Sequence, residues 1–361
     1  MGRKVTYGYD MDLNVRKLFR QDNTLFDYLA DYHTIYLDSG RSCIRQLCQL
    51  IEGREILVPS FSCFAVIHAF AFGVRPVFYN IFDDFSIDVA DLEAKIGPET
   101  AAVYFNNYYG HLQSAETVKT VRELADSHRL LVFEDNTQSI FSTGILAGDY
   151  ALSSTRKWWA VPDGAVIYSG NELDDVLWGG LRQDSKQMDK LYPQTLKFMI
   201  LKHRIDYPAS GVADMFAEVE KELDEYTANG EVFLMSDFTH FIYECNSYPD
   251  MILKRRENER YLRSLITNPY IRFPFESFRE GECPFQLPMY CETRDDLTSY
   301  MTETFNIFPS VLWRTHLYPE VSGIGNTARM GREIFSLPVD QRYDREDMEF
   351  LAEALNSYRP A

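Results

Sequence analysis

The sequence predicts an α/β protein with a mainly parallel sheet, followed by a smaller α+β region. Five short apolar segments have the length and composition of buried strands: 56–59, 75–81, 101–105, 130–135 and 164–169. Between them, residues 42–51, 61–72 and 115–128 carry apolar residues at helical spacing. Strands that alternate with helices indicate βαβ units, and ligands of such sheets collect at the carboxyl ends of the strands.

The C-terminal part of the chain has a different pattern. Residues 251–266 form an amphipathic helical pattern, followed by a strand-like segment at 285–291 and a helical pattern near 294–304. Residues 334–358 then predict a strand, a turn and a final helix. Because these elements do not repeat the strand–helix alternation of the first half, we expect an α+β arrangement here.

The length and the change of pattern together predict two domains. A chain of 361 residues is too long for one ordinary core. Residues 171–250 are acidic and aromatic with mixed periodicity, which indicates the end of the first domain and a helical connection. We therefore expect a large domain over 1–245, including a polar, partly helical lead-in at 1–35, and a smaller domain over 246–361.

Composition and charge exclude several classes of function. Apolar residues make up 45% of the chain and the formal charge is −18, so nucleic acid is not an expected partner. The chain has no run of eighteen apolar residues and no signal-peptide core, which predicts a cytoplasmic protein without a membrane partner. Its six cysteines show no metal-ligand spacing, which predicts reduced, mostly buried thiols and no metal site.

The first candidate for chemistry is the start of the helical pattern near residue 42, where Ser39, Gly40, Arg41 and Ser42 follow one another. Unpaired N–H groups at a helix start, with the helix dipole behind them, bind anions such as phosphate. Gly40 would let the backbone approach a phosphate closely. The alternative is an ordinary helix N-cap with a glycine beside it.

The second candidate follows the buried strand at 130–135. Asp135 stands at its carboxyl end, where a carboxylate can pair with a protonated ring nitrogen, and Gln138 can donate to a neighbouring oxygen. The alternative is that Asp135 caps the structure that follows.

The third candidate is Lys157, which follows Ser153 and Ser154 and precedes Trp158 and Trp159. An apolar environment favours the neutral amine of a lysine, which is the nucleophile that Schiff-base chemistry requires. The hydroxyl of Ser154 could bind a phosphate from the same turn. The alternative is a surface lysine whose stem packs on the aromatic rings.

Taken in chain order, these three candidates resemble the fold-type-I pyridoxal phosphate enzymes. More closely, the sequence is similar to the DegT/DnrJ/EryC1/StrS family of sugar aminotransferases. The stretches that carry the resemblance are 39–47, 55–81, 105–111, 132–139, 148–166 and 336–351. The family implies a seven-stranded type of sheet with helices on both faces, pyridoxal 5'-phosphate as the cofactor, and a homodimer.

The resemblance also implies roles for individual residues. Lys157 would hold the cofactor as a Schiff base, Asp135 would pair with the pyridine nitrogen, and Gln138 would contact the ring hydroxyl. Asn107 is a further candidate contact with the ring oxygen. The phosphate would be held by the remaining members of the set, namely Gly40, the backbone of Arg41 and Ser42, and a hydroxyl of Ser153 or Ser154.

Several positions depart from the family pattern. Cys63 stands where an aromatic residue usually stacks on the cofactor ring, and Phe61 or Phe64 could replace it, with Phe64 chosen for the site. Pro162 and Ala165 replace glycines. Residues 232–236 differ from a family segment that commonly reaches across the dimer. The departures affect the expected substrate more than the expected cofactor.

The family analogy implies transfer of an amino group from an amino acid, by analogy glutamate, to a nucleotide-linked keto sugar for surface polysaccharide or amino-sugar biosynthesis. One alternative is sugar dehydration, which relatives perform with histidine in place of the lysine. The other is a non-catalytic binding or regulatory protein, which Cys63, Pro162 and Leu234 favour and the retention of Asp135 and Lys157 opposes.

Binding of the acceptor needs basic groups. Residues 202–204, Lys-His-Arg, form the strongest local cluster, with Arg182 nearby in the sequence; the alternative is a solvated helix face. Arg314 and His316 are alternatives in the smaller domain.

Overall fold

The computed structural model describes residues 18–70, 73–143, 146–182 and 231–360. These residues fall into two compact units. The first unit contains described residues 18–52, 150–182 and 231–248, and the second contains 53–70, 73–143, 146–149 and 249–360. Because both units combine separate stretches of the chain, they do not test the predicted domain division at residues 245 and 246, which stays a prediction.

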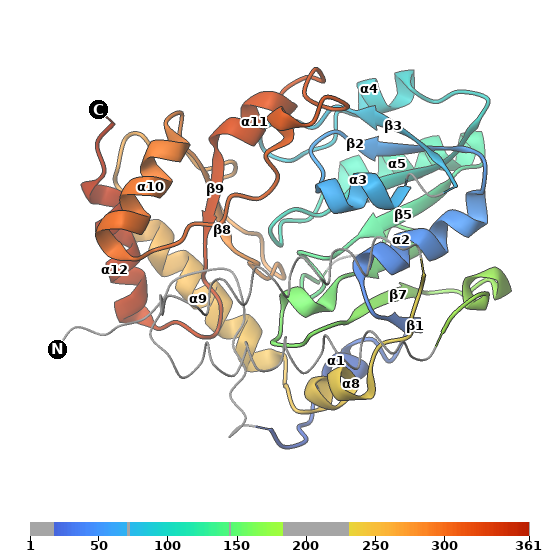
Figure 1. Cartoon of the computed structure of the whole chain (residues 1–361), viewed down its shortest axis with the longest axis horizontal. Helices are drawn as coiled ribbons and strands as arrows, with labels where there is room; N and C mark the ends of the chain where they lie inside the picture. Colours follow the sequence, from blue (N-terminus) through green and yellow to red (C-terminus); the bar gives the residue numbers. More distant parts are fainter. Residues whose placement is uncertain (1–17, 71–72, 144–145, 183–230, 361) are drawn as a thin grey trace. The chain divides into compact units, whose positions relative to one another are not determined.

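The second unit contains the predicted parallel strands. Strands β3 (Arg75–Tyr79), β2 (Glu55–Pro59), β4 (Thr100–Asn106) and β5 (Leu131–Asp135) lie in that order, and every neighbouring pair is parallel. Helices α3 (Phe64–Phe70), α4 (Val89–Ala94) and α5 (Ala115–His128) lie in the connections between them (Figure 1). The prediction of βαβ units is therefore confirmed.

Local sequence explains the bounds of α5, which match the predicted range. The side chain of Ser114 accepts a hydrogen bond from the N–H of Thr117 and caps the first turn. The helix ends where Arg129 adopts a left-handed conformation with φ of 56°. Val121 and Ala125 face the core, where they join buried residues of β4 and β5 such as Val103 and Val132.

The first unit contains three antiparallel strands in the order β1 (His33–Leu37), β7 (Ala165–Ser169) and β6 (Tyr150–Ser153). With the four parallel strands of the second unit they make the seven strands of a mainly parallel sheet. Helix α2 (Gly40–Cys48), continued by the 3-10 turn η2 (Gln49–Ile51), packs against these three strands. The fold class predicted from the sequence is confirmed.

The described start of the chain corrects one expectation. The polar lead-in at 1–35 was predicted to be partly helical, and α1 (Leu25–Tyr28) is a helix. However, His33–Leu37 is a strand that pairs with β7, from His33 opposite Ser169 to Leu37 opposite Ala165. The strand alternates buried Ile35 and Leu37 with more exposed neighbours, a period of two that is too short to stand out in a polar context.

The remaining described elements of the first unit lie after β6 in the chain. They are the 3-10 turns η3 (Thr155–Lys157) and η4 (Asp175–Trp178) and the helix α8 (Asp237–Glu244). Ser236 caps α8 by accepting a hydrogen bond from the N–H of Thr239. Residues 202–204, which the sequence suggested for the acceptor, lie outside the described residues.

The C-terminal part of the second unit is α+β in character, as predicted. Strands β8 (Leu287–Tyr290) and β9 (Ile334–Leu337) form an antiparallel pair. The other elements are α9 (Pro249–Leu265), α10 (Arg294–Phe305), η5 (Thr315–Leu317), α11 (Thr327–Glu333) and α12 (Arg345–Ser357). Helix α12 packs against both α9 and α10, and the three helices lie close together in Figure 1.

A buried asparagine attaches α9 to the segment after β9. Asn258 is 3% exposed, and its amide group donates hydrogen bonds to the carbonyl oxygens of Val339, Asp340 and Tyr343. These carbonyls lie in an irregular turn without strand partners. The side chain therefore supplies hydrogen bonds that secondary structure cannot supply at this point.

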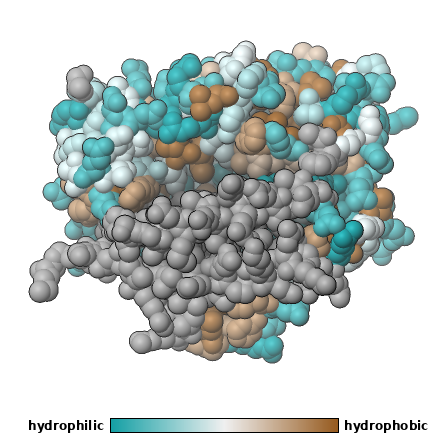
Figure 2. Space-filling model, viewed as in Figure 1, coloured by the Kyte–Doolittle hydropathy of each residue, from teal (hydrophilic) through white to brown (hydrophobic). Residues whose placement is uncertain are grey.

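The surface and the helices agree with a water-exposed globular composition. On the face shown in Figure 2, hydrophilic residues are interspersed with small hydrophobic areas over the described surface. Among the residues that the structure describes, no helix combines the length and the apolar character that a membrane span needs. All six cysteines are free, and five are buried, as the sequence predicted; Cys63 is half-buried.

We expect Asn258→Ala to lower the free energy of unfolding by about 1–3 kcal/mol, because three carbonyl groups lose the amide as a donor, although that of Asp340 keeps the N–H of Tyr343. Urea denaturation followed by circular dichroism measures the change. Glu257→Ala is the matched control, since Glu257 is exposed on the same helix. Equal midpoints for the two variants would show that the asparagine does not stabilise this turn.

Candidate active site

The predicted phosphate site begins where β1 leads into α2. Ser39 adopts extended dihedral angles, and its hydroxyl accepts a hydrogen bond from the N–H of Ser42 at 3.2 Å, so it is the N-cap of α2. A Cβ atom on Gly40 would lie 3.1 Å from Cβ of Ser154. The structure therefore brings the first residue of α2 against the serine pair after β6, and glycine makes that approach possible.

The serine pair itself is deeply buried. Ser153 is the last residue of β6 and is 0% exposed, and Ser154 is 7% exposed. The hydroxyl of Ser153 has no hydrogen-bond partner among the described residues. A buried hydroxyl without a partner is unusual in a folded protein and indicates a group that is supplied from outside the chain.

Lys157 lies at the end of η3, three residues after Ser154. The turn is held by a hydrogen bond of 2.6 Å between the hydroxyl groups of Thr155 and Tyr243. Lys157 is half-buried, and it is followed by Trp158 and Trp159, which are 0% and 4% exposed. Lys157 is therefore partly covered and is followed in the chain by two buried aromatic residues; its role in the site stays a prediction.

The loop after Lys157 is anchored by Asp163. Its carboxylate accepts hydrogen bonds from the N–H and the hydroxyl of Ser236, both at 2.8 Å, and from the hydroxyl of Thr239. Gly164 adopts a φ of 121°, and a Cβ atom there would clash with the Tyr243 hydroxyl. These contacts join the loop to α8, an arrangement that the sequence analysis did not predict.

A second buried carboxylate, that of Asp38, directly precedes the N-cap of α2. Asp38 is 4% exposed, and burial raises its pKa to about 6, although a hydrogen bond from Ser42 opposes the shift and the charge of Asp163 adds to it. Charge interaction also couples Asp38 to the guanidinium of Arg45. The helix start thus holds a carboxylate that titrates far above its ordinary range.

In the second unit, Asp135 ends β5 and is 6% exposed. One carboxylate oxygen, Oδ1, accepts a hydrogen bond from the N–H of Thr137 at 2.8 Å, and the other, Oδ2, accepts one from the hydroxyl of Tyr104 at 2.5 Å. Asp135 therefore does cap the turn that follows, which was the alternative interpretation. Each oxygen can accept a second hydrogen bond, so the carboxylate can still bind a further donor while it caps the turn.

Gln138 lies in the same turn and has one unused donor group. Its side-chain oxygen accepts a hydrogen bond from the N–H of Tyr109 at 2.7 Å, which fixes the amide. Its side-chain nitrogen, Nε2, is buried and has no hydrogen-bond partner among the described residues. An orphaned amide donor three residues after a buried carboxylate fits a ligand with an acceptor oxygen near a ring nitrogen.

Asn107 is used differently from the sequence expectation. Its amide nitrogen donates to Glu134 at 2.9 Å and to Asn136 at 2.8 Å, and its oxygen accepts from the N–H of Gln113 at 2.8 Å. Both N–H groups of the amide thus hold the protein's own turn. A contact between Asn107 and a cofactor oxygen stays a prediction.

The two candidate stacking residues have different environments. Phe61 is 0% exposed and packs against Tyr108 and Trp313, with ring centroids 5.9 and 5.2 Å away. Phe64, on the first turn of α3, is 46% exposed and lies 5.3 Å from the ring of Tyr318. Phe61 is committed to the core, so Phe64 has the more accessible ring; its stacking role stays a prediction.

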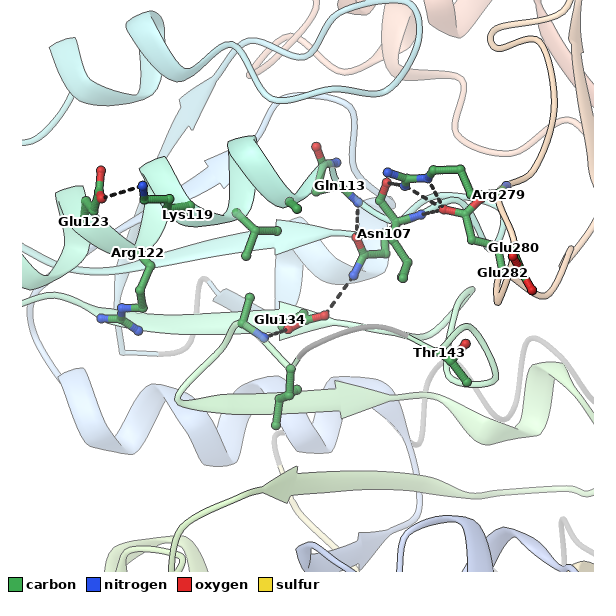
Figure 3. Close-up of a pocket in the computed structure, with 15 residues that line it drawn as sticks. Asn107, Gln113, Lys119, Arg122, Glu123, Glu134, Thr143, Arg279, Glu280 and Glu282 are labelled. Carbon is green, nitrogen blue, oxygen red and sulfur yellow. Dashed lines mark hydrogen bonds and ion pairs between the residues drawn. The ribbon is translucent and has the colours of Figure 1, made fainter.

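A cavity of about 530 Å³ lies beside Asn107 and Glu134 (Figure 3). Side chains of α5 line one part of it, and Arg279 and Glu282 line another. Asp135 and Gln138 are not among the described residues that line it. Successive side chains of a strand point to opposite faces, so Glu134 and Asp135 lie on different faces of the sheet.

The charged groups around this cavity are paired with one another. Figure 3 shows Lys119 next to Glu123, and Arg279 bound to Glu282. Burial raises the pKa of Glu134, although donors from Ala147, Asn136 and other neighbours oppose the shift. The cavity therefore presents paired charges and apolar side chains rather than an open binding group.

Two of the described candidate residues for the acceptor, both arginines, form ion pairs. Arg182 forms an ion pair with Glu231 at 2.5 Å, and Arg314 forms one with Asp295 at 3.3 Å. Burial lowers the pKa of His316. Their part in substrate binding stays a prediction.

Residues 17–148 match the model of the DegT/DnrJ/EryC1/StrS aminotransferase family. This match bears out the resemblance to that family over this stretch of the chain. It covers the start of α2, Asp135 and Gln138, whereas Lys157 lies beyond it.

Curated relatives give a mixed picture. The chain is 29% identical over 158 residues to the pleiotropic regulatory protein of Geobacillus stearothermophilus. This alignment covers 40% of this chain and 42% of that protein. It is 23% identical over 323 residues to the dTDP-3-amino-3,6-dideoxy-alpha-D-galactopyranose transaminase of Aneurinibacillus thermoaerophilus, which covers 85% and 79%. The chain thus spans less than half the length of the first of these relatives.

A solved structure supports the fold. NtdA from Bacillus subtilis, with bound cofactor PMP, superimposes with a TM-score of 0.61 at 19% identity, which covers 92% of this chain and 74% of that chain. With the mainly parallel sheet, this likeness confirms a fold of type I.

We expect Asp38→Asn to stabilise the protein at pH 7 by about 2–3 kcal/mol relative to wild type. The raised pKa means that folded Asp38 keeps a proton that the unfolded chain has lost, so wild-type stability falls as the pH rises from about 4 to about 6. The advantage of the variant should therefore vanish below about pH 4.

Urea denaturation at pH 4, 5, 6 and 7 measures this difference. Asp31→Asn is the control, because Asp31 is an exposed carboxylate of the same unit. A difference between Asp38→Asn and wild type that does not change with pH would contradict the assignment.

Proposed function

We propose that this protein is a pyridoxal-phosphate-dependent aminotransferase that moves an amino group from an amino acid, by analogy glutamate, to a keto sugar. The observation that carries the proposal is a buried carboxylate at the end of β5 that is followed, three residues later in the chain, by a buried donor without a partner among the described residues. Asp135 and Gln138 offer, in one turn, an acceptor for a ring N–H and a donor for a ring oxygen.

The residues of the first unit fit the other end of the same cofactor. The N-terminus of α2 offers N–H groups and a positive dipole end for a phosphate. Gly40 lies against Ser154, and the hydroxyl of Ser153 lacks a partner among the described residues. In a chain with a formal charge of −18, a phosphate needs such local donors, because the overall field repels it.

When bound, pyridoxal phosphate supplies an aldehyde that takes up the amino group and a ring that stores the electron pair released at the substrate carbon. The protein's residues do the rest. Lys157 would hold the cofactor through Nζ. Once the amino acid has taken its place, the free amine at Nζ would accept and then donate a proton, first as a base and then as an acid.

Asp135 acts on the ring nitrogen. A buried carboxylate beside that nitrogen keeps a proton on it, and a protonated ring withdraws electrons more strongly. Gln138 fixes the ring orientation through its free N–H group, since its oxygen is already held by the N–H of Tyr109. Phe64, from the first turn of α3, would stack on the ring.

The proposed substrates and assembly follow the relatives. The transaminase from Aneurinibacillus thermoaerophilus is named for a dTDP-linked amino sugar, and its alignment covers most of this chain. We therefore propose a nucleotide-linked keto sugar as the acceptor, in amino-sugar or surface-polysaccharide biosynthesis. A cytoplasmic homodimer is the proposed form, as in the family that the sequence resembles.

A second function has one specific observation in its favour. The pleiotropic regulatory protein of Geobacillus stearothermophilus is 29% identical over 158 residues. A regulatory relative would not need a reactive lysine, and Cys63 and Pro162 depart from the family pattern. Against it stand the buried, partly unpartnered groups around Asp135 and Ser153, which cost stability unless a ligand uses them.

We expect wild-type protein with added pyridoxal phosphate to show a visible absorbance band that glutamate bleaches, with release of 2-oxoglutarate. Lys157→Ala should lose the band and reduce amino transfer by about 10²–10⁴-fold or more, because it lacks both the covalent attachment and the proton carrier. Absorbance spectra and a coupled assay for 2-oxoglutarate measure both effects.

Lys95→Ala is the control, since Lys95 lies at the C-cap of α4 and pairs only with a carboxylate of its own helix. Identical spectra for wild type and Lys157→Ala would refute the proposed mechanism. A wild-type protein without any band would favour the regulatory alternative.

A further inference from the structure

Tyr104 is a buried residue that the sequence analysis did not single out, and its hydroxyl binds the proposed catalytic carboxylate. It lies on β4, next to β5, and donates a hydrogen bond of 2.5 Å to Oδ2 of Asp135. The side chain is 0% exposed. A hydrogen bond between a hydroxyl and a carboxylate in such a site is of the strong, charge-assisted kind.

The ring of Tyr104 is held in place by its surroundings. It packs edge-on against Phe70 of α3 at a centroid distance of 4.9 Å. The carbonyl group of Tyr104 accepts a hydrogen bond from the hydroxyl of Tyr79 at 2.9 Å. The side chain therefore has little freedom, and its hydroxyl stays aimed at the carboxylate.

The direction of the hydrogen bond is fixed by electrostatics. Burial raises the pKa of the Tyr104 hydroxyl well above its ordinary value, and the neighbouring charge of Asp135 raises it further. Tyr104 is therefore a permanent donor at neutral pH. Because Thr137 donates to Oδ1 on the other side, the carboxylate plane is fixed at both oxygens.

We propose that Tyr104 is a positioning residue that keeps the carboxylate of Asp135 turned toward the nitrogen of the cofactor ring. The proposal rests on the proposed function and deepens it. A carboxylate that is 6% exposed has few waters around it, so each protein donor matters. A carboxylate fixed beside the ring nitrogen would favour a proton on that nitrogen, and loss of the tyrosine donor would weaken this preference.

The test compares Tyr104→Phe with Tyr290→Phe. Both remove one hydroxyl from a buried tyrosine on a strand of the second unit, but the Tyr290 hydroxyl donates to the carbonyl group of Asp83 and not to Asp135. The readouts are the dissociation constant of pyridoxal phosphate, from tryptophan fluorescence, and the pH midpoint of the visible spectrum of the bound cofactor. Thermal melting reports the structural cost of each change.

We expect Tyr104→Phe to bind pyridoxal phosphate about 10- to 100-fold more weakly, as for the loss of a hydrogen bond to a charged group. The pH midpoint of the visible spectrum should rise. A ring that lacks its positive charge would let the nitrogen that joins Lys157 to the cofactor hold its proton more tightly. Tyr290→Phe should lower the melting temperature by a similar amount and leave the dissociation constant within about threefold of wild type and the spectral midpoint unchanged.

A double-mutant cycle separates positioning from general packing. Asp135→Asn removes the carboxylate, so adding Tyr104→Phe to it should cause little further loss of cofactor affinity. If the two losses add, Tyr104 does not act through Asp135 and the inference is overturned.

Two further outcomes are decisive. If wild type binds no pyridoxal phosphate, the proposed function fails; if wild type binds it and Tyr104→Phe matches wild type in both readouts, only this inference fails. Should Tyr104→Phe not fold, p-aminophenylalanine at position 104 keeps the ring and a weaker donor. Its affinity should then be lower and its midpoint higher than those of wild type, and unchanged values would overturn the inference.

Discussion

The hydrogen bond between the Tyr104 hydroxyl and the Asp135 carboxylate joins β4 and β5 near the carboxyl ends of both strands. Parallel pairing places these strand ends at one edge, and the alternation of side chains sends Asp135 to one face and Glu134 to the other. The carboxylate is buried, so it must be stabilised by donors from the protein. Tyr104 and Thr137 supply them, and the remaining acceptor positions of Asp135 are what a ring N–H would use.

The buried polar groups around this edge divide into satisfied and unsatisfied sets. Asn107 and Glu134 use their polar atoms on each other and on the backbone of the same turns, which makes them structural. Gln138 and Ser153 keep a buried polar atom without a partner among the described residues. Folding alone does not compensate the free-energy cost of burying such groups without a hydrogen bond. In the proposed function a bound cofactor would use both atoms, and both residues belong to the set that the sequence had singled out.

Close backbone approach is the other requirement of the site. Gly40 lets the first turn of α2 lie against Ser154, and Gly164 lets the loop after Lys157 pass the hydroxyl of Tyr243. In the second unit, Gly110 fits against the carbonyl of Cys283, while His111 next to it pairs with Glu282. Burial alone would raise the pKa of Glu282, but the interaction with His111 and hydrogen bonds from the N–H groups of Arg279 and Leu112 lower it to about 2. These contacts hold the turn in which the N–H of Tyr109 donates to the side-chain oxygen of Gln138.

The sequence by itself determined the features that depend on local spacing. The apolar runs predicted β2, β4, β5 and β7, helical spacing predicted α5, and the order of Gly40, Asp135 and Lys157 predicted the class of site. Only the tertiary structure decided the pairing of β1 with β7, the use of the Asn107 amide on Glu134, and the contact of Tyr104 with Asp135. These depend on residues far apart in the chain: 31 positions separate Tyr104 from Asp135, and in the sequence Tyr104 is one more aromatic residue of a buried strand. The periodicity of apolar residues indicates which face of a strand is buried, but it does not indicate which polar group lies opposite a given side chain.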